Sequence, residues 1–165
     1  MYDLLYQDRL LIDGTGAPAF RADIALQQGR IAAIGDLGDS PAHQTINASG
    51  RYICPGLIDI HTHSDLTLVI DGRAYSSLAQ GITTQIMGNC GVSAAPTREG
   101  DPYYGPLDPS MTRGLDCDWV QFDQYFARLE AQGLGTNTAT LVGHGNIRVA
   151  AMVYENRAPT AREMN

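Results

Sequence analysis

The sequence predicts an α/β protein in which a β-rich N-terminal part precedes a parallel sheet. Residues 1–55 hold short apolar stretches separated by turn residues, as in "DGTG" and "QQGR", which is typical of strands joined by tight turns. After Pro55 and Gly56, apolar stretches alternate with helical patterns, and that alternation indicates strand–helix–strand units. We therefore expect part of a small β-sandwich domain at 1–55 and an α/β domain at 56–165.

The N-terminal part is expected to consist of short strands and turns. Residues 3–12, "DLLYQDRLLI", are rich in apolar side chains. Residues 22–35 are predicted to form a hairpin, because Ile24 and Leu26 alternate with polar or small residues before a Gln-Gly turn. Residues 44–56 hold two more short strands on either side of a Ser-Gly turn.

The second part shows strand and helix patterns in regular order. The predictions are a strand at 57–61, a short helix at 75–81, a strand at 83–89, a helix at 120–133, a strand at 136–145 and a helix beginning at Pro159. The helix at 120–133 is indicated by apolar residues at helical spacing and by the glycine that ends it. The stretch between Gly91 and Trp119, rich in Gly, Pro and Asp, is expected to be a long loop.

Composition excludes several classes of partner. The net charge of −7 argues against binding to nucleic acid or to an anionic membrane surface. No apolar run approaches the roughly eighteen residues of a transmembrane helix, and the first ten residues lack the basic start of a signal peptide. Three cysteines in a chain of 165 residues fit a reducing compartment, so we expect the cytoplasm.

Residues that bind metals fall at the carboxyl ends of the predicted strands. His61 and His63 follow the first strand, Cys90 the second and His144 the third. Active sites of (β/α)8 barrels lie at this edge. Because His61 and His63 are two residues apart on a strand, their side chains would face the same side. Cys90, on a neighbouring strand, would lie within reach of a metal ion that the two histidines hold. Thiolate and imidazole together favour zinc.

Each of these residues also has an ordinary structural explanation. An isolated His-x-His occurs by chance, Cys90 alone is more often a buried small apolar residue, and His144 alone fits a structural or pocket-lining role. Their combination at successive strand ends favours a metal site. Cys54 is expected to be a packing residue, and Cys117 an incidental thiol in a polar loop.

Three phrases resemble a known family. "PGLIDIHTHSD" resembles the first barrel strand of the amidohydrolase superfamily. "GITTQIMGNCGVSAAP" is similar to the second-strand signature of its D-aminoacylase branch, the N-acyl-D-amino-acid deacylases, and "LVGHGNIRVAAM" to that branch's third-strand region. The resemblance covers essentially the whole chain, and the phrase around the cysteine is much more specific than the two histidines.

This resemblance implies a zinc hydrolase that removes the acyl group from a small-molecule N-acyl-D-amino acid. In that family the residues matching His61, His63 and Cys90 belong to the metal centre. The cysteine takes the place of a carboxylated lysine found in hydantoinase-like relatives. The family's general base is an aspartate of the eighth strand, and two further histidine ligands come from the fifth and sixth strands.

Chain length implies that this site continues elsewhere. A (β/α)8 barrel needs about 250 residues, and roughly 110 follow Pro55, enough for about three strands. We therefore expect an incomplete barrel whose general base and other ligands lie beyond Asn165. The remainder of its own barrel would be a partner, and the 165-residue chain alone is expected to be inactive and poorly folded.

Substrate contacts are predicted on the long loop. It is a candidate lid that carries Arg98, Tyr104 and Arg113, and an arginine there would pair with a substrate carboxylate. An equally open alternative is that each of these arginines is a solvated charge of the loop and contacts no substrate. His144 is a further candidate for the substrate pocket. Two residues are expected to orient the metal ligands or their loops: Asp65 and Asn89.

Two other functions remain open from the sequence. One is a different amidohydrolase, such as a dihydroorotase- or hydantoinase-like cyclic amidase, against which Cys90 argues because those enzymes use a carboxylated lysine. The other is a non-catalytic, truncated fragment that binds a partner, which the expected absence of a base would favour.

Overall fold

The computed structural model describes residues 1–98 and 115–164. The chain divides into two compact units, Met1–Pro55 and Gly56–Asn165. Each unit has its own sheets, and each is described by itself.

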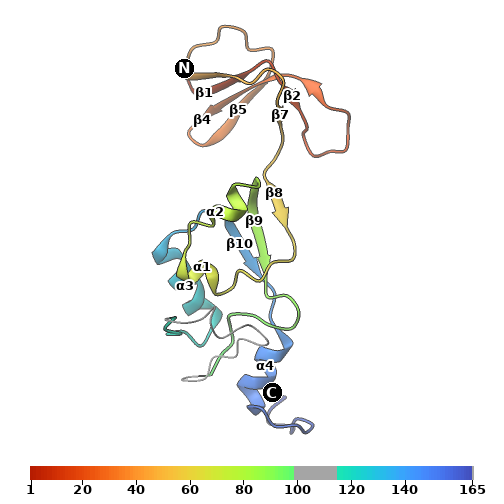
Figure 1. Cartoon of the computed structure of the whole chain (residues 1–165), viewed down its shortest axis with the longest axis vertical. Coiled ribbons are helices and arrows are strands. Elements are labelled where there is room, and N and C mark those ends of the chain that lie inside the picture. Colours follow the sequence, from red (N-terminus) through yellow and green to blue (C-terminus); the bar gives the residue numbers. More distant parts are fainter. Residues whose placement is uncertain (99–114, 165) are drawn as a thin grey trace. The chain divides into compact units, whose positions relative to one another are not determined.

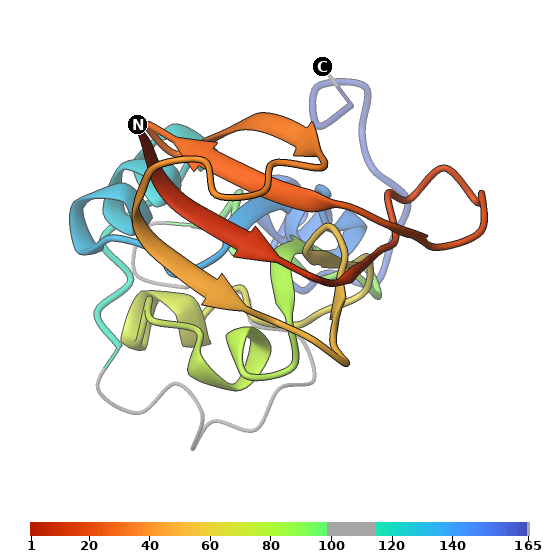
Figure 2. The same cartoon turned by 90° about the horizontal axis from the view of Figure 1, so that it is seen from above.

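The first unit contains a four-stranded sheet in the order β5-β4-β1-β6 (Figure 2). Its strands are β1 (Tyr2–Gln7), β4 (Asp23–Gln27), β5 (Arg30–Gly35) and β6 (Ala42–Asn47). Strands β4 and β5 form the predicted antiparallel hairpin. Its turn residues Gln28 and Gly29 both have left-handed backbones, with φ of 51° and 71°, as a two-residue hairpin turn of the favoured hand requires.

A second, three-stranded sheet completes the first unit in the order β3-β2-β7. Its strands are β2 (Leu10–Leu11), β3 (Phe20–Arg21) and β7 (Tyr52–Ile53). The buried apolar residues of this unit form a small core: Leu5, Leu11, Ile24, Ala25 and Ala48. Arg9 is also buried, and its guanidinium has no hydrogen-bond partner among the described residues.

The second unit is built on a parallel sheet in the order β10-β9-β8. Its strands are β8 (Leu57–Asp59), β9 (Ile82–Met87) and β10 (Asn137–Thr140), and their arrows point the same way in Figure 1. Helices separate successive strands along the chain, so the predicted α/β class with parallel strands is confirmed.

The described residues of this unit also form helices α1 (Thr67–Ile70), α2 (Tyr75–Leu78), α3 (Phe122–Gln132) and α4 (His144–Met152). Of these, α1 and α3 share a buried apolar cluster with the central strand. Met87 of β9 packs in one buried cluster with Leu68 and Val69 of α1 and with Tyr125 and Leu129 of α3. This cluster fixes the carboxyl end of β9, next to which Cys90 lies.

Some sequence-based boundaries are wrong. Strand β8 ends at Asp59, so His61 and His63 lie in the segment after the strand and not on it. Residues 144–145, predicted to end a strand, begin helix α4. No helix begins at Pro159; residues 161–164 form turns. Helix α1 is a single turn, too short to produce a periodic pattern.

The ends of the predicted long loop pack into the core. Ala94, Ala95 and Trp119 belong to the buried cluster, and the Trp119 indole N–H donates to the Ala94 carbonyl at 2.8 Å. The apolar "VSAAP" stretch therefore behaves as core and not as a solvated loop. Within residues 1–98 and 115–164, no helix combines the length and apolar character needed to cross a bilayer.

Candidate metal centre

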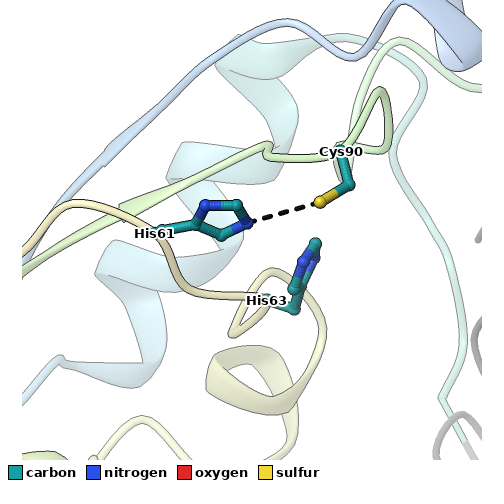
Figure 3. A group of neighbouring side chains, drawn as sticks. All are labelled: His61, His63 and Cys90. Atoms are coloured by element: carbon teal, nitrogen blue, oxygen red, sulfur yellow. Dashed lines mark hydrogen bonds between the residues drawn. The ribbon is translucent and has the colours of Figure 1, made fainter.

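Three side chains converge beyond the carboxyl ends of β8 and β9. Figure 3 shows the rings of His61 and His63 and the thiol of Cys90 gathered around one space. His61 Nε2 lies 3.3 Å from Cys90 Sγ, and the two imidazole centroids are 5.5 Å apart. One ligand atom from each residue lies within 4.8 Å of the others.

Hydrogen bonds shape the segment that carries the histidines. The His61 N–H donates to the Asp59 carboxylate at 3.0 Å, which bends the chain as it leaves β8. The Thr62 N–H donates to the Ile86 carbonyl of β9 at 3.1 Å. The segment is thus held against the neighbouring strand, which brings both imidazoles to the same side without the extended strand that the sequence predicts.

Cys90 reaches the histidines through an unusual backbone. Its φ is +56°, and φ is +75° at Gly88 and +79° at Gly91. Glycine adopts this left-handed region freely, whereas it costs other residues about 1–2 kcal/mol. A Cβ at Gly88 would also lie 2.0 Å from the Leu141 carbonyl oxygen. Two features therefore favour glycine at position 88: its left-handed backbone and the close approach of the segment after β10, which leaves no room for a Cβ.

A buried polar pair that sequence reasoning missed fixes the chain beyond Cys90. The Ser93 N–H donates to Asn146 Oδ1 at 2.8 Å, and the Gly143 N–H donates to Ser93 Oγ at 2.9 Å. Asn146, in the first turn of α4, is fully buried. The residues fall within "CGVS" and "GHGN", but nothing in their spacing indicates that the two segments meet.

The donor set fits a zinc ion. Ligand atoms of a tetrahedral zinc site lie roughly 3.3–3.7 Å apart, given Zn–N near 2.0–2.1 Å and Zn–S near 2.3 Å. The distance of 3.3 Å between His61 and Cys90 meets this value, and the widest pair, within 4.8 Å, needs to close by at most about 1.5 Å. All three side chains are exposed, so a metal held here would be accessible to a small molecule.

Asp65 and Asn89 lie beside this cluster, where the sequence predicts orienting residues. Asp65 is buried, and its carboxylate accepts the Gly88 N–H at 3.0 Å. Burial raises the pKa of Asp65, and hydrogen bonds from backbone N–H groups oppose this shift. The Asn89 amide donates to the Thr62 carbonyl at 3.3 Å and to the Ile86 carbonyl at 2.9 Å.

The other predicted site residues are not in this cluster. His144 is the exposed first residue of α4 and is not among the three clustered ligands. Arg98 is exposed, while Tyr104, Arg113 and most of the predicted lid lie outside the described residues.

The expectation for Cys54 is wrong, whereas nothing contradicts that for Cys117. Cys54 is exposed and not a packing residue. Cys117 is partly buried and packs against the core cluster.

A family model and several curated relatives match this chain. A family model described as the Amidohydrolase family matches residues 44–153. A D-aminoacylase from Alcaligenes xylosoxydans xylosoxydans is 40% identical over 163 residues, which covers 99% of this chain and 33% of the relative. An N-acyl-D-glutamate deacylase from the same organism is 41% identical, covering 98% and 32%.

Solved structures of an N-acyl-D-glutamate deacylase and a D-aminoacylase also match this chain. An N-acyl-D-glutamate deacylase from Bordetella bronchiseptica, complexed with zinc and a phosphonate that mimics the tetrahedral intermediate, is 45% identical with a TM-score of 0.84. A D-aminoacylase structure is 37% identical with a TM-score of 0.89. These matches cover 98% and 99% of this chain and 34% of each known structure. The chain spans about a third of the length of the curated relatives it matches, and it belongs to the amidohydrolase family.

Proposed function

We propose that the chain forms the N-terminal part of a zinc-dependent hydrolase that cleaves the amide bond of N-acyl-D-amino acids. The observation that carries this proposal is the convergence of His61, His63 and Cys90 at the carboxyl ends of two parallel strands. Its substrate class rests on the similarity to D-aminoacylase and N-acyl-D-glutamate deacylase over nearly the whole chain.

The chain's residues would hold the metal and leave one side of it open. His61 and His63 would bind as neutral imidazoles and Cys90 as a thiolate. When bound there, zinc would polarise an amide carbonyl and lower the pKa of a water molecule. The exposure of the three ligands leaves room for a substrate. We propose that the general base is an aspartate of a later strand, outside these 165 residues.

We further propose that residues 56–165 supply about three strands of a (β/α)8 barrel, and residues 1–55 part of a small β-sandwich domain. Strands β8 and β10 each pair only with β9 among the described residues. Large apolar side chains are exposed on and beyond these two strands: Leu57, Ile58, Ile60, Leu141 and Val142. Further strands of the same barrel would cover them.

A cyclic amidase of the hydantoinase type is a weaker candidate. An L-hydantoinase from Arthrobacter aurescens is 26% identical with a TM-score of 0.58, below the 0.89 for D-aminoacylase.

We also propose a cytoplasmic location, which the free, exposed thiols of Cys54 and Cys90 support.

Stereospecific kinetics test the proposed activity. The natural full-length protein, loaded with zinc, is assayed on N-acetyl-D-amino acids, their L-enantiomers, hydantoin and dihydroorotate. We expect the D-enantiomers to be hydrolysed at least 100-fold faster than the L-enantiomers (~3 kcal/mol in the transition state). Equal rates on both enantiomers, or a preference for a cyclic amide, would contradict the proposal.

A further inference from the structure

The two chain segments that carry the metal ligands exchange side-chain hydrogen bonds. The histidine segment is residues 61–65, and the cysteine segment is residues 86–90. Asn89 of the cysteine segment donates to the Thr62 carbonyl at 3.3 Å. In return, Asp65 of the histidine segment accepts the Gly88 N–H at 3.0 Å. Each segment therefore places one polar side chain on the backbone of the other.

The Asn89 contact acts between the two histidines. Thr62 is the residue between His61 and His63, so a shift of its peptide group moves both imidazoles. The same Asn89 amide donates to the Ile86 carbonyl at 2.9 Å, which also accepts the Thr62 N–H at 3.1 Å. One side chain thus joins the peptide between the histidines to the strand that leads to Cys90.

The hydrogen bond between Asp65 and Gly88 acts at the start of the turn that carries Cys90. Gly88 is buried and left-handed, and Asp65 is 5% exposed. A left-handed backbone at the non-glycine Cys90 persists only where its surroundings determine it. The bond between Asp65 and Gly88 fixes the start of that turn, and the Tyr125 hydroxyl, which donates to the Asp65 carbonyl at 2.7 Å, fixes Asp65 itself.

We propose that Asn89 and Asp65 are positioning residues that hold the histidine and cysteine segments in the register at which one metal ion can bind all three ligands. This inference rests on the proposed metal-binding role of His61, His63 and Cys90. It goes further because two side chains that are not metal ligands, Asn89 and Asp65, would set the relative positions of the three ligands. Partners that orient metal ligands typically contribute 10–100-fold to metal affinity.

Variants can separate positioning from general stability. Asn89→Ala removes the donor to Thr62, and Asp65→Ala removes the acceptor for Gly88. Asp65→Asn keeps an acceptor oxygen of the same size and should rescue the function. A matched control is Asn137→Ala, because the Asn137 amide also donates to a carbonyl of a neighbouring segment, that of Thr83, at 3.3 Å, away from the ligands.

The experiment measures zinc affinity by competition with a chelating dye in the natural full-length protein, and the near-ultraviolet thiolate-to-cobalt absorption after Co(II) substitution. We expect Asn89→Ala and Asp65→Ala to weaken zinc binding about 10–100-fold and to reduce or shift the thiolate-to-cobalt band. Asp65→Asn and Asn137→Ala should stay within about threefold of the wild type, with an unchanged band, whatever their effect on thermal stability.

Two results would overturn the proposal in different ways. Unchanged zinc affinity and cobalt spectrum in Asn89→Ala would show that the contacts only stabilise the fold. Asn89 is only partly buried, so this variant decides the question even if Asp65→Ala fails to fold. Absence of the thiolate-to-cobalt band in the wild type would instead overturn the proposed metal site, and this inference with it.

Discussion

At the residue scale, the cluster of His61, His63 and Cys90 depends on the backbone conformations that position the Cys90 thiol. Gly88 has φ +75°, and the Leu141 carbonyl oxygen occupies the space beside it, whereas Gly91 has φ +79° and nothing within 4 Å of an added Cβ. The two glycines therefore share a conformation and differ in their surroundings. This difference separates the cost of a left-handed backbone from the cost of a steric clash.

We expect Gly88→Ala to lower the free energy of unfolding by about 3 kcal/mol or more, because backbone strain and a clash with a main-chain oxygen add. Gly91→Ala should cost only about 1 kcal/mol, from the left-handed conformation alone. Urea unfolding of the two variants of the natural full-length protein measures both. Equal losses would show that the approach of Leu141 has no energetic consequence.

Sequence reasoning predicts the ligands but not the geometry that unites them. Residue type and position at strand ends select His61, His63, Cys90 and His144, and the structure brings only the first three together among the described residues. The sequence places the histidines on a strand, whereas Asp59 and Ile86 hold them in a bend after it. The pairing of Ser93 with Asn146 joins residues 53 positions apart, which no local pattern encodes.

At the scale of elements, helix α3 supports the histidine segment through one buried hydroxyl. Tyr125 is 0% exposed, and its hydroxyl donates to the Asp65 carbonyl at 2.7 Å. Burial of the phenol and, to a smaller extent, the nearby Asp65 carboxylate raise the pKa of Tyr125 well above its usual range. The folded state therefore strongly favours the neutral phenol.

This shift predicts a loss of stability at alkaline pH. Below about pH 10 the phenol is neutral in both states. Above it the unfolded state ionises while the folded state does not, so the free energy of unfolding falls as pH rises toward the raised pKa. Tyr125→Phe should remove this component and cost about 1–3 kcal/mol at neutral pH, because the buried Asp65 carbonyl loses its donor.

Urea unfolding between pH 7 and pH 11 of the wild type and Tyr125→Phe measures both effects. The wild type should lose more stability per pH unit above pH 10 than the variant. Parallel profiles for the two proteins would contradict a buried, neutral Tyr125.

The sequence patterns predict helices α2 and α3 but neither α1 nor α4. The repeat of Phe122, Tyr125, Phe126 and Leu129 with a terminal glycine predicts α3, and the structure confirms it. Helix α4 begins soon after β10 ends, so its first two residues, His144 and Gly145, fall within the predicted strand.

At the scale of the whole molecule, both outer strands of the parallel sheet offer unpaired edges among the described residues. Exposed side chains such as Ile58 at 62% and Ile60 at 74% lie along one of them. Such apolar edges bind other strands or other molecules. We expect residues 1–165 expressed alone to bind the dye ANS and to self-associate, whereas the natural full-length protein should not.

Fluorescence with ANS and analytical ultracentrifugation of the two polypeptides test this expectation. Weak dye binding and a sharp cooperative melt of monomeric residues 1–165 would contradict it, and would show that three strands suffice for a stable unit.

The most direct test of the proposed metal centre is the zinc environment itself. X-ray absorption at the zinc edge of the natural full-length protein should show a sulfur ligand at about 2.3 Å and nitrogen ligands near 2.0–2.1 Å. Cys90→Ala should lose the sulfur contribution and bind less zinc. The exposed Cys54→Ala, as the control, should keep both. A wild-type spectrum without sulfur, or a sulfur signal that survives Cys90→Ala, would contradict the assignment of His61, His63 and Cys90 as one metal site.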